Sequence, residues 1–424
     1  MVFFKSQHHL PTVITGMLGN ILEWYDFALY GFLVVVISKV FFPPGDPIVS
    51  LISTYGVFAV GFLARPIGGW FFGYVGDVFS RRRALLLSVS MMGVATFLLG
   101  TLPNYETIGI LATVFLVILR LFQGLSVGGE FSTSVTYMVE NASPKRRGLS
   151  GSFANIGGNL GMLFGVGAAA AVTTLFSHDM LYEWGWRIPF LVGGIFGLVT
   201  LLASKRLPAH VMHKKENRHS AKTPLREAFS NNRRELMAGL TISLGYAVFF
   251  YLALVYLPTY SNEFLGISLE SALNINTVVV AASIFLIPLF GYLSDRIWRR
   301  KKMIMVSFVI AALMAVPSFY FLEQGGTTEL LIVQTLLMIA VAVPLGTAPA
   351  LYVELFPKSD RLTAYSITYN ISLGIFGGTT PIIVTWLVHT TGNGLIPGFY
   401  LIVALAVSIF GLVMMRDRSR EPLR

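Results

Sequence analysis

The chain is a succession of long apolar stretches separated by short polar ones. Most apolar stretches run for about 20 residues or more, and a helix of that length crosses a hydrocarbon core of roughly 30 Å. We predict twelve membrane-spanning helices, at about residues 11–40, 50–76, 83–102, 107–139, 148–176, 187–204, 235–261, 270–294, 302–322, 328–355, 362–389 and 395–416. The pattern therefore predicts an all-α integral membrane protein.

One polar stretch is longer than the other connections. Residues 205–234 are basic and contain no apolar run long enough to cross a membrane. A stretch of this length between packed helices is typical of a linker. We therefore predict three parts: a six-helix bundle over residues 1–204, a cytoplasmic linker over 205–234, and a second six-helix bundle with a short tail over 235–424.

Three groups of residues occur once in each half. The stretch 73–83 returns at 291–301, with Gly, Tyr, Asp and a basic triplet at the same spacing. The residues around Glu140 return around Glu354, and Asn155 with its following glycines is echoed by Asn370 with its own. The offset is close to 215 residues each time. Such a repeat indicates a duplicated, pseudo-symmetric bundle, as in many secondary transporters.

Composition supports a membrane protein. Of the 424 residues, 54% are hydrophobic and only 12% are charged, whereas a soluble domain carries roughly 25% charged residues. There is no cysteine, which excludes disulfides and thiolate chemistry. Residues 1–10 are short and polar, so we expect no cleaved signal peptide.

The net charge of +10 raises the question of a nucleic-acid partner, but the placement of the charges argues against one. Lys and Arg cluster in every second connection, while the connections between them hold acids. This alternation follows the positive-inside rule. It predicts a multi-pass membrane protein with both termini in the cytoplasm, and no nucleic-acid partner.

Five charged residues fall within the predicted spans: Glu23 and Asp26 in the first, Arg65 in the second, and Arg120 and Glu130 in the fourth. Charges in hydrocarbon are costly and are usually functional, so we expect these residues to pair. The pair Asp26–Arg120 is either a fixed packing element or a proton switch, in which the acid takes a proton when it separates from the arginine. We predict that these two couple protons, assisted by Glu23 and Glu130.

The second half carries neutral polar residues at depth instead. We expect substrate contacts from both halves, namely Arg120, Arg65, Tyr25, Tyr246, Tyr251, Asn274, Tyr369 and Asn370. Since arginine stays charged, Arg120 could also hold a substrate carboxylate. The seventh predicted helix is rich in aromatic residues, which either pack and face lipid or form a cage for a quaternary ammonium.

Acids and arginines at the predicted cytoplasmic helix ends could latch the halves together. This predicted gate comprises Asp77, Arg81, Glu140, Arg147, Asp295, Arg299, Glu354 and Arg361. The same residues could instead serve topology and helix capping. No phosphate-binding loop ending in Gly-Lys-Ser/Thr and no metal-binding histidine spacing occurs, so we expect neither an enzyme nor any cofactor or metal.

These motifs resemble the major facilitator superfamily over almost the whole chain, most specifically through the paired Gly-x-x-x-Asp-x-x-x-Arg-Arg loops. Within it, Gly19-Asn20-Ile21-Leu22-Glu23-Trp24-Tyr25-Asp26-Phe27 is similar to the metabolite:proton symporters, as are Gly61–Pro66, Arg120–Glu130 and Trp186–Phe190. That family takes up proline and betaine, shikimate, 2-oxoglutarate, citrate or other small carboxylates with protons. Related sugar:proton symporters pair an acid at the position of Asp26 with an arginine at that of Arg120.

The resemblance implies a proton-coupled symporter that imports a small carboxylate-bearing metabolite across a bacterial inner membrane. We expect it to work as a monomer. Tyr256-Leu257-Pro258-Thr259-Tyr260 looks most like the proline/betaine branch, so the first candidate for the substrate is a zwitterion such as proline or betaine. The best-known osmosensing form has a long C-terminal coiled coil, whereas this sequence stops at Arg424, so we expect no gating by such a tail. The alternatives are a di- or tricarboxylate symporter, an exporter of drugs or siderophores, and a non-transporting membrane receptor.

Overall fold

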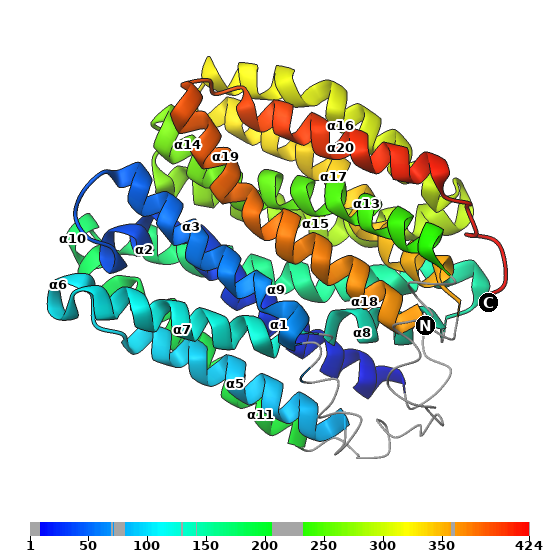
Figure 1. The fold of residues 1–424 in the computed structure, drawn as a ribbon, viewed down its shortest axis with the longest axis horizontal. Helices are drawn as coiled ribbons and strands as arrows, with labels where there is room; N and C mark the ends of the chain where they lie inside the picture. The colour runs from blue at the N-terminus through cyan, green and yellow to red at the C-terminus, as the bar shows by residue number, and fades with distance from the viewer. Residues whose placement is uncertain are drawn as a thin grey trace.

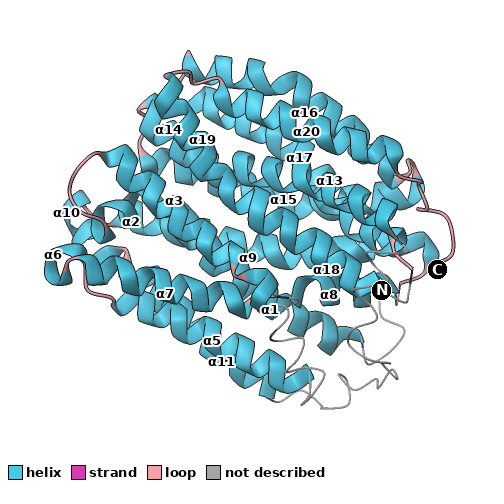
Figure 2. Cartoon of the chain, in the orientation of Figure 1, coloured by secondary structure: helices cyan, strands magenta, loops and turns pink. Residues whose placement is uncertain are grey.

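The computed structural model describes residues 9–68, 71, 81–128, 130–140, 142–205, 232–357 and 361–423. Over these ranges the chain is helical, and they contain no β-strand (Figure 2). The long helices lie side by side in two groups. In Figure 1, the first half of the chain, blue to green, fills the lower part of the molecule and the second half, green to red, the upper part.

The first half supplies α1 (His9–Phe32), α2 (Val34–Phe41), α3 (Pro47–Leu63), α5 (Arg81–Thr101), α6 (Tyr105–Ile108), α7 (Ile110–Ser126), α8 (Glu130–Glu140), η1 (Pro144–Arg146), α9 (Arg147–Leu175), α10 (His178–Met180), η2 (Leu181–Gly185) and α11 (Arg187–Lys205). The second half supplies α13 (Arg233–Phe250), η4 (Tyr251–Tyr256), α14 (Leu257–Leu265), α15 (Leu269–Arg296), α16 (Arg300–Glu323), α17 (Thr327–Leu355), α18 (Arg361–Ile371), η5 (Ser372–Gly377), α19 (Gly378–Thr391) and α20 (Ile396–Met414).

The described helices account for the twelve predicted spans. Nine are long and apolar enough to cross a membrane, and α1 with α2 forms a tenth, broken span. The remaining two are the shorter apolar helices Leu86–Thr101 and Ile110–Ser126. The first span is not the single straight helix that the sequence predicted. It bends by 68° between Phe32 and Val34, close to Gly31, and glycine is a common cause of such bends.

Two spans of the second half contain a widened, π-helical turn near their middle. The turn η4 joins α13 to α14, and η5 joins α18 to α19. Both face the first half, since η4 packs against α1 and η5 packs against α3. Such turns are frequent at functional sites because they shift the side chains that follow out of the regular helical register.

The two halves contact each other through α9 with α15 and α17, and through α3 with α19. The approach of α9 to α15 is close enough to require glycine. A Cβ atom on Gly148 would lie 2.5 Å from the carbonyl oxygen of Gly291, and one on Gly291 would lie 2.9 Å from that of Gly148. Small residues at this position let the two backbones touch directly.

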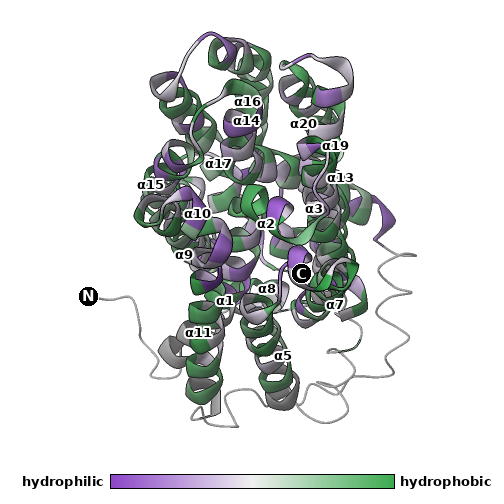
Figure 3. Cartoon of the chain, turned by 90° about the vertical axis from the view of Figure 1, so that its left-hand side faces the viewer, coloured by the Kyte–Doolittle hydropathy of each residue, from purple (hydrophilic) through white to green (hydrophobic). Residues whose placement is uncertain are grey.

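The distribution of polarity is inverted relative to a soluble protein. Large apolar side chains of α15, α16 and α20 lie exposed, for example Phe285, Leu313 and Phe410. Most of the ribbon in Figure 3 carries the green of hydrophobic residues. By contrast, the arginines Arg65 and Arg120 are only 1% and 0% exposed. An apolar exterior around buried charges is what a lipid environment selects.

Candidate functional site

Asp26 lies at the centre of a hydrogen-bond network built from three spans of the first half. Arg120 Nη1 donates to Asp26 Oδ2 at 2.8 Å. Thr96 Oγ1 and Gln123 Nε2 both donate to Asp26 Oδ1 at 2.7 Å. Gln123 Oε1 in turn accepts from Arg120 Nη1 at 2.7 Å. All four side chains are completely buried, so both carboxylate oxygens are compensated without water.

Aromatic rings complete the surroundings of Arg120. Its guanidinium carbon lies 3.9 Å from the ring centroid of Tyr30 and 5.2 Å from that of Phe27. A desolvated cation over an aromatic face is stabilised by the ring quadrupole. Arg120 is thus enclosed by residues of the first half, which supports its predicted pairing with Asp26.

A second buried ion pair joins Glu23 of α1 to Arg65, which follows α3. Arg65 Nη2 donates to Glu23 Oε1, and the guanidinium lies over the ring of Phe62. The two acids differ, since Glu23 Oε2 has no hydrogen-bond partner whereas both oxygens of Asp26 have one. Arg65 Nε also lacks a partner, as do Nε and Nη2 of Arg120. Unpaired polar atoms at such depth are costly, and each one requires an explanation.

The Glu23–Arg65 pair lines a narrow pocket between the two halves. The walls of this pocket approach so closely that it leaves no room for a water molecule. Its lining residues are Glu23, Arg65, Val127, Phe131, Ser132, Tyr369 and Asn370. Across the boundary, the rings of Phe131 and Tyr369 stack with centroids 4.6 Å apart. The pocket is therefore collapsed, with one acid, one base and an aromatic pair in its walls.

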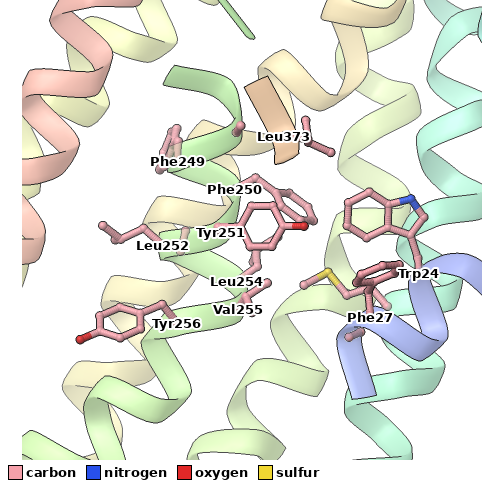
Figure 4. Close-up of a cluster of buried hydrophobic side chains, with 14 of the residues drawn as sticks. Trp24, Phe27, Phe249, Phe250, Tyr251, Leu252, Leu254, Val255, Tyr256 and Leu373 are labelled. Atoms are coloured by element: carbon pink, nitrogen blue, oxygen red, sulfur yellow. The ribbon is translucent and has the colours of Figure 1, made fainter. Parts of the chain in front are cut away.

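The aromatic residues Phe250, Tyr251 and Tyr256 in and next to η4 pack against the first half and do not face lipid. Phe250 meets Trp24 edge-on with ring centroids 5.3 Å apart (Figure 4). Tyr251 meets Phe62 with ring centroids 5.5 Å apart. All of them are buried, which excludes the lipid-facing alternative for these side chains. The hydroxyl of Tyr251 has no hydrogen-bond partner.

Five of the eight predicted substrate contacts do not line the pocket: Arg120 and Tyr251, described above, and Tyr25, Asn274 and Tyr246. Tyr25 donates its hydroxyl to the carbonyl of Pro189 at 2.6 Å, so it ties α1 to α11 within the first half. Asn274 is exposed, and the prediction that it faces the interior was wrong. Asn276 is the buried amide of α15 and accepts from Gln334, because two helical positions differ by about 200° in direction. Tyr246 is buried on α13 but does not line the pocket.

At the end of the bundle where α9 begins and α15 and α17 end, charged residues join the halves. We call this the charged end. Arg147 pairs with Glu354 at 3.6 Å, and Arg361 pairs with Glu140. Asp295 belongs to the same cluster, whereas Arg299, another predicted gate residue, is exposed.

Arg300, the first residue of α16, holds both neighbouring acids. It pairs with Asp295 at 2.8 Å and with Glu354 at 3.3 Å. The prediction named Arg299 instead, but Arg299 is the extended N-cap residue before α16 and its side chain is exposed. The predicted gate residue Asp77 and the side chains of Arg81 and Glu130 lie outside what the structure describes.

The segment after α20 reaches into the charged end. Arg147 donates to the carbonyl of Glu421 at 2.9 Å, and Arg300 donates to that of Ser419 at 3.2 Å. Lys301 caps the last turn of α20 by donating to the carbonyl of Met415 at 2.6 Å. One arginine from each half is thus tied to the same short segment.

The sequence analysis missed Thr96 and Gln123, which complete the Asp26 network. The sequence could have indicated Gln123, because it lies three residues after Arg120 and so shares its helix face. It gives no indication of Thr96, since threonine is common in membrane helices. Among the described residues, no group of His, Asp and Glu could hold a metal ion.

Comparison with known proteins identifies the family. The model of the Major Facilitator Superfamily matches residues 16–285 and 265–424. The chain is 33% identical to the proline/betaine transporter of Salmonella typhimurium, over 97% of this chain and 84% of that protein. It is 34% identical to the alpha-ketoglutarate permease of Escherichia coli, over 99% and 96%. The crystal structure of a D-xylose-proton symporter superposes with a TM-score of 0.75 at 19% identity, over 99% of this chain and 100% of that one. The chain is therefore a multi-pass membrane protein with the two-bundle, twelve-helix fold, and it belongs to the major facilitator superfamily.

Proposed function

We propose that this protein is a proton-coupled symporter that imports a small carboxylate-bearing metabolite by alternating access. The observation that carries the proposal is the Asp26 network. It places a carboxylate, fully desolvated and compensated by Arg120, Thr96 and Gln123, in the middle of a membrane bundle. Acids at such depth mark proton and ion pathways in transporters.

In this proposal the conformational change alters the surroundings of Asp26. The carboxylate of Asp26 accepts all of its hydrogen bonds and donates none. This is the pattern of an ionised carboxylate. If α1 moves relative to α5 and α7, Asp26 loses the compensation of Arg120 and takes up a proton to neutralise its charge. Return to the present arrangement restores the ion pair and releases the proton.

The charged end acts as the gate on the side that we propose to be cytoplasmic. Its pairs Arg147–Glu354 and Arg361–Glu140 join the two halves and must break before that side can open. At the opposite end, contact between the halves is aromatic, as in Tyr55 with Tyr256 at 6.3 Å between ring centroids. The present arrangement is then an occluded state, with a collapsed pocket closed at both ends.

The names of the relatives indicate the class of substrate. The proline/betaine transporter of Salmonella typhimurium and the alpha-ketoglutarate permease both carry small carboxylates. We propose a zwitterionic osmolyte or amino acid, such as proline or betaine, as the substrate. We also propose a bacterial inner membrane as the location, with both termini in the cytoplasm and a monomer as the working unit.

A proton-flux assay tests this proposal. Purified protein is reconstituted into liposomes in weak buffer, and proline, glycine betaine or 2-oxoglutarate is added outside. A symporter alkalinises the external medium as substrate enters. Acidification would indicate an antiporting exporter, and binding without counterflow of labelled substrate would indicate a receptor.

Asp26→Asn separates coupling from translocation. We expect this variant to lose uphill accumulation driven by a pH gradient while it still exchanges labelled for unlabelled substrate. Uphill uptake equal to that of the unchanged protein would show that Asp26 does not carry the proton.

A dicarboxylate is the second candidate substrate, because the 2-oxoglutarate relative is as similar as the proline/betaine relative. Arg120 and Arg65 are two buried cations of the first half, and two cations could balance two carboxylates. The proton-flux assay distinguishes the two classes of substrate directly. Only the transported class, either the zwitterions or the dicarboxylate, should alkalinise the external medium when it is added.

A further inference from the structure

We propose that Glu23 and Arg65 together form a binding site for a zwitterion, with Glu23 holding the ammonium group and Arg65 the carboxylate. This inference rests on the proposed transport function and deepens it. It assigns the two buried ion pairs different tasks, since Asp26–Arg120 serves the proton and Glu23–Arg65 serves the substrate.

The difference begins with the two acids. Both oxygens of Asp26 are occupied by donors from the first half. Glu23 has only one occupied oxygen, and its Oε2 is buried with no partner. An anionic oxygen left unpaired at 5% exposure is destabilising unless a ligand supplies a donor or a positive charge.

The pocket geometry points the same way. Glu23 and Arg65 line the pocket, whereas Asp26 and Arg120 do not. The pocket also spans the boundary between the halves, because Tyr369 and Asn370 of α18 form part of its wall. A ligand held there would contact both halves and could therefore control how they close.

The wall residues also suit an ammonium group. The stacked rings of Phe131 and Tyr369 lie in the same pocket as Glu23. Aromatic faces attract ammonium groups, including those that carry methyl groups and cannot donate hydrogen bonds. Arg65 offers a planar fork that matches a carboxylate.

Charge balance sets the substrate class. The pocket lining contains one acid and one arginine, which neutralise each other when the pocket is empty. A zwitterion separates them and gives each a new partner, so no buried charge remains alone. A ligand with only one charge would leave either Glu23 or Arg65 unpaired, which is strongly unfavourable in a closed pocket. A dicarboxylate would in addition repel Glu23.

Binding measurements on purified full-length protein test this inference. The probes are proline, cyclopentanecarboxylate, which lacks the nitrogen, prolinamide, which lacks the carboxylate, and 2-oxoglutarate. We expect the unchanged protein to bind proline at least about tenfold more tightly than the other three. Glu23→Gln should remove the preference for proline over cyclopentanecarboxylate, and Arg65→Gln should remove its preference over prolinamide.

Matched controls separate these effects from misfolding. Glu270→Gln and Arg296→Gln make the same chemical changes at exposed positions and should keep the preference for proline. Melting temperatures establish that each variant is folded, and the double variant Glu23→Gln/Arg65→Gln removes both charges and so leaves neither one unpaired. We expect this double variant to bind proline, cyclopentanecarboxylate and prolinamide with similar affinity.

The outcomes distinguish this inference from the proposed function. Proton-coupled uptake that persists while folded Glu23→Gln still prefers proline over cyclopentanecarboxylate would overturn the inference and leave the symporter intact. Preference for 2-oxoglutarate in the unchanged protein would also overturn it. Charge-dependent selection of proline without any proton flux would support the site and refute symport.

Discussion

The carboxylate of Asp295 accepts the backbone N–H of Gly148 at 2.8 Å, which joins the end of α15 to the start of α9. Its other oxygen accepts the N–H of Leu149 at 2.9 Å. An acid from one half therefore caps the first turn of a helix in the other half, where the helix dipole favours negative charge. Because Arg300 also donates to this carboxylate, one side chain connects several parts of the charged end.

Asp295→Asn should shift the protein towards a state open at the charged end. Asparagine has one acceptor oxygen and no charge, so it cannot cap both amides and pair with Arg300. The loss of a charged hydrogen bond corresponds to a shift of about tenfold or more in the ratio of closed to open molecules. Double electron–electron resonance would measure this shift between spin labels attached to cysteines introduced at Lys145 and Lys302. The chain has no cysteine of its own, so only these two positions would be labelled.

The control for this measurement is Glu270→Gln, an exposed acid at the opposite end of α15. It should leave the distance distribution between the labels unchanged. An Asp295→Asn distribution identical to that of the control would show that the cap does not hold the charged end closed.

Removal of residues 418–424 should also favour opening of the charged end. The truncation takes away the carbonyls that accept from Arg147 and Arg300. We expect the same pair of labels to show a few-fold larger open population, with little change in the melting temperature, because most of the apolar core lies outside this segment. An unchanged distance distribution between the labels would show that residues 418–424 do not hold the charged end closed.

Arg120→Gln should lower the free energy of unfolding by about 3–5 kcal/mol, because it leaves the buried carboxylate of Asp26 without its cation. The double variant Asp26→Asn/Arg120→Gln should recover most of this loss, since no lone charge remains. Unfolding in mild detergent would measure both values. If the loss of unfolding free energy in the double variant equals the sum of the losses in the two single variants, the side chains do not act as a pair.

Gly124→Ala should destabilise the first half, because a Cβ atom there would lie 1.8 Å from the carbonyl oxygen of Gly61. Overpacking of this kind costs about 1–3 kcal/mol. Gly167→Ala in α9 is the matched control, since a Cβ there meets nothing within 4 Å. The control should be neutral or slightly stabilising. Equal melting temperatures for the two variants would contradict the close packing of α7 against α3.

Much of this architecture is visible in the sequence because lipid imposes strict rules. Hydrocarbon thickness fixes the length of each apolar stretch, so the spans and the duplication can be located from the residues alone. The same rules predict that the charges of the first half pair with each other. The pairing of Asp26 with Arg120 was predicted by name. The cost of an isolated charge also predicts that Arg65 has a partner, but it does not identify that partner as Glu23.

Other features depend on rotation about the helix axis, which the sequence constrains weakly in a span that is apolar on all sides. Asn274 and Asn276 differ only in which side of α15 they occupy. Arg299 and Arg300 differ for another reason, since α16 begins at Arg300 and Arg299 is its extended N-cap residue. The π-helical turns η4 and η5 have no sequence signature and change this rotation midway along a span. The sequence therefore predicted which charged residues are buried and paired better than it predicted which side of its helix each polar residue occupies.

The arginines at the charged end contact the segment after α20 through main-chain oxygens at Ser419 and Glu421. Every amino acid supplies that oxygen, so these positions are free to diverge in evolution without loss of the contact. An insertion or deletion of a single residue, by contrast, would displace both carbonyls from the arginines. Selection in this segment should therefore act on its length more strongly than on its composition.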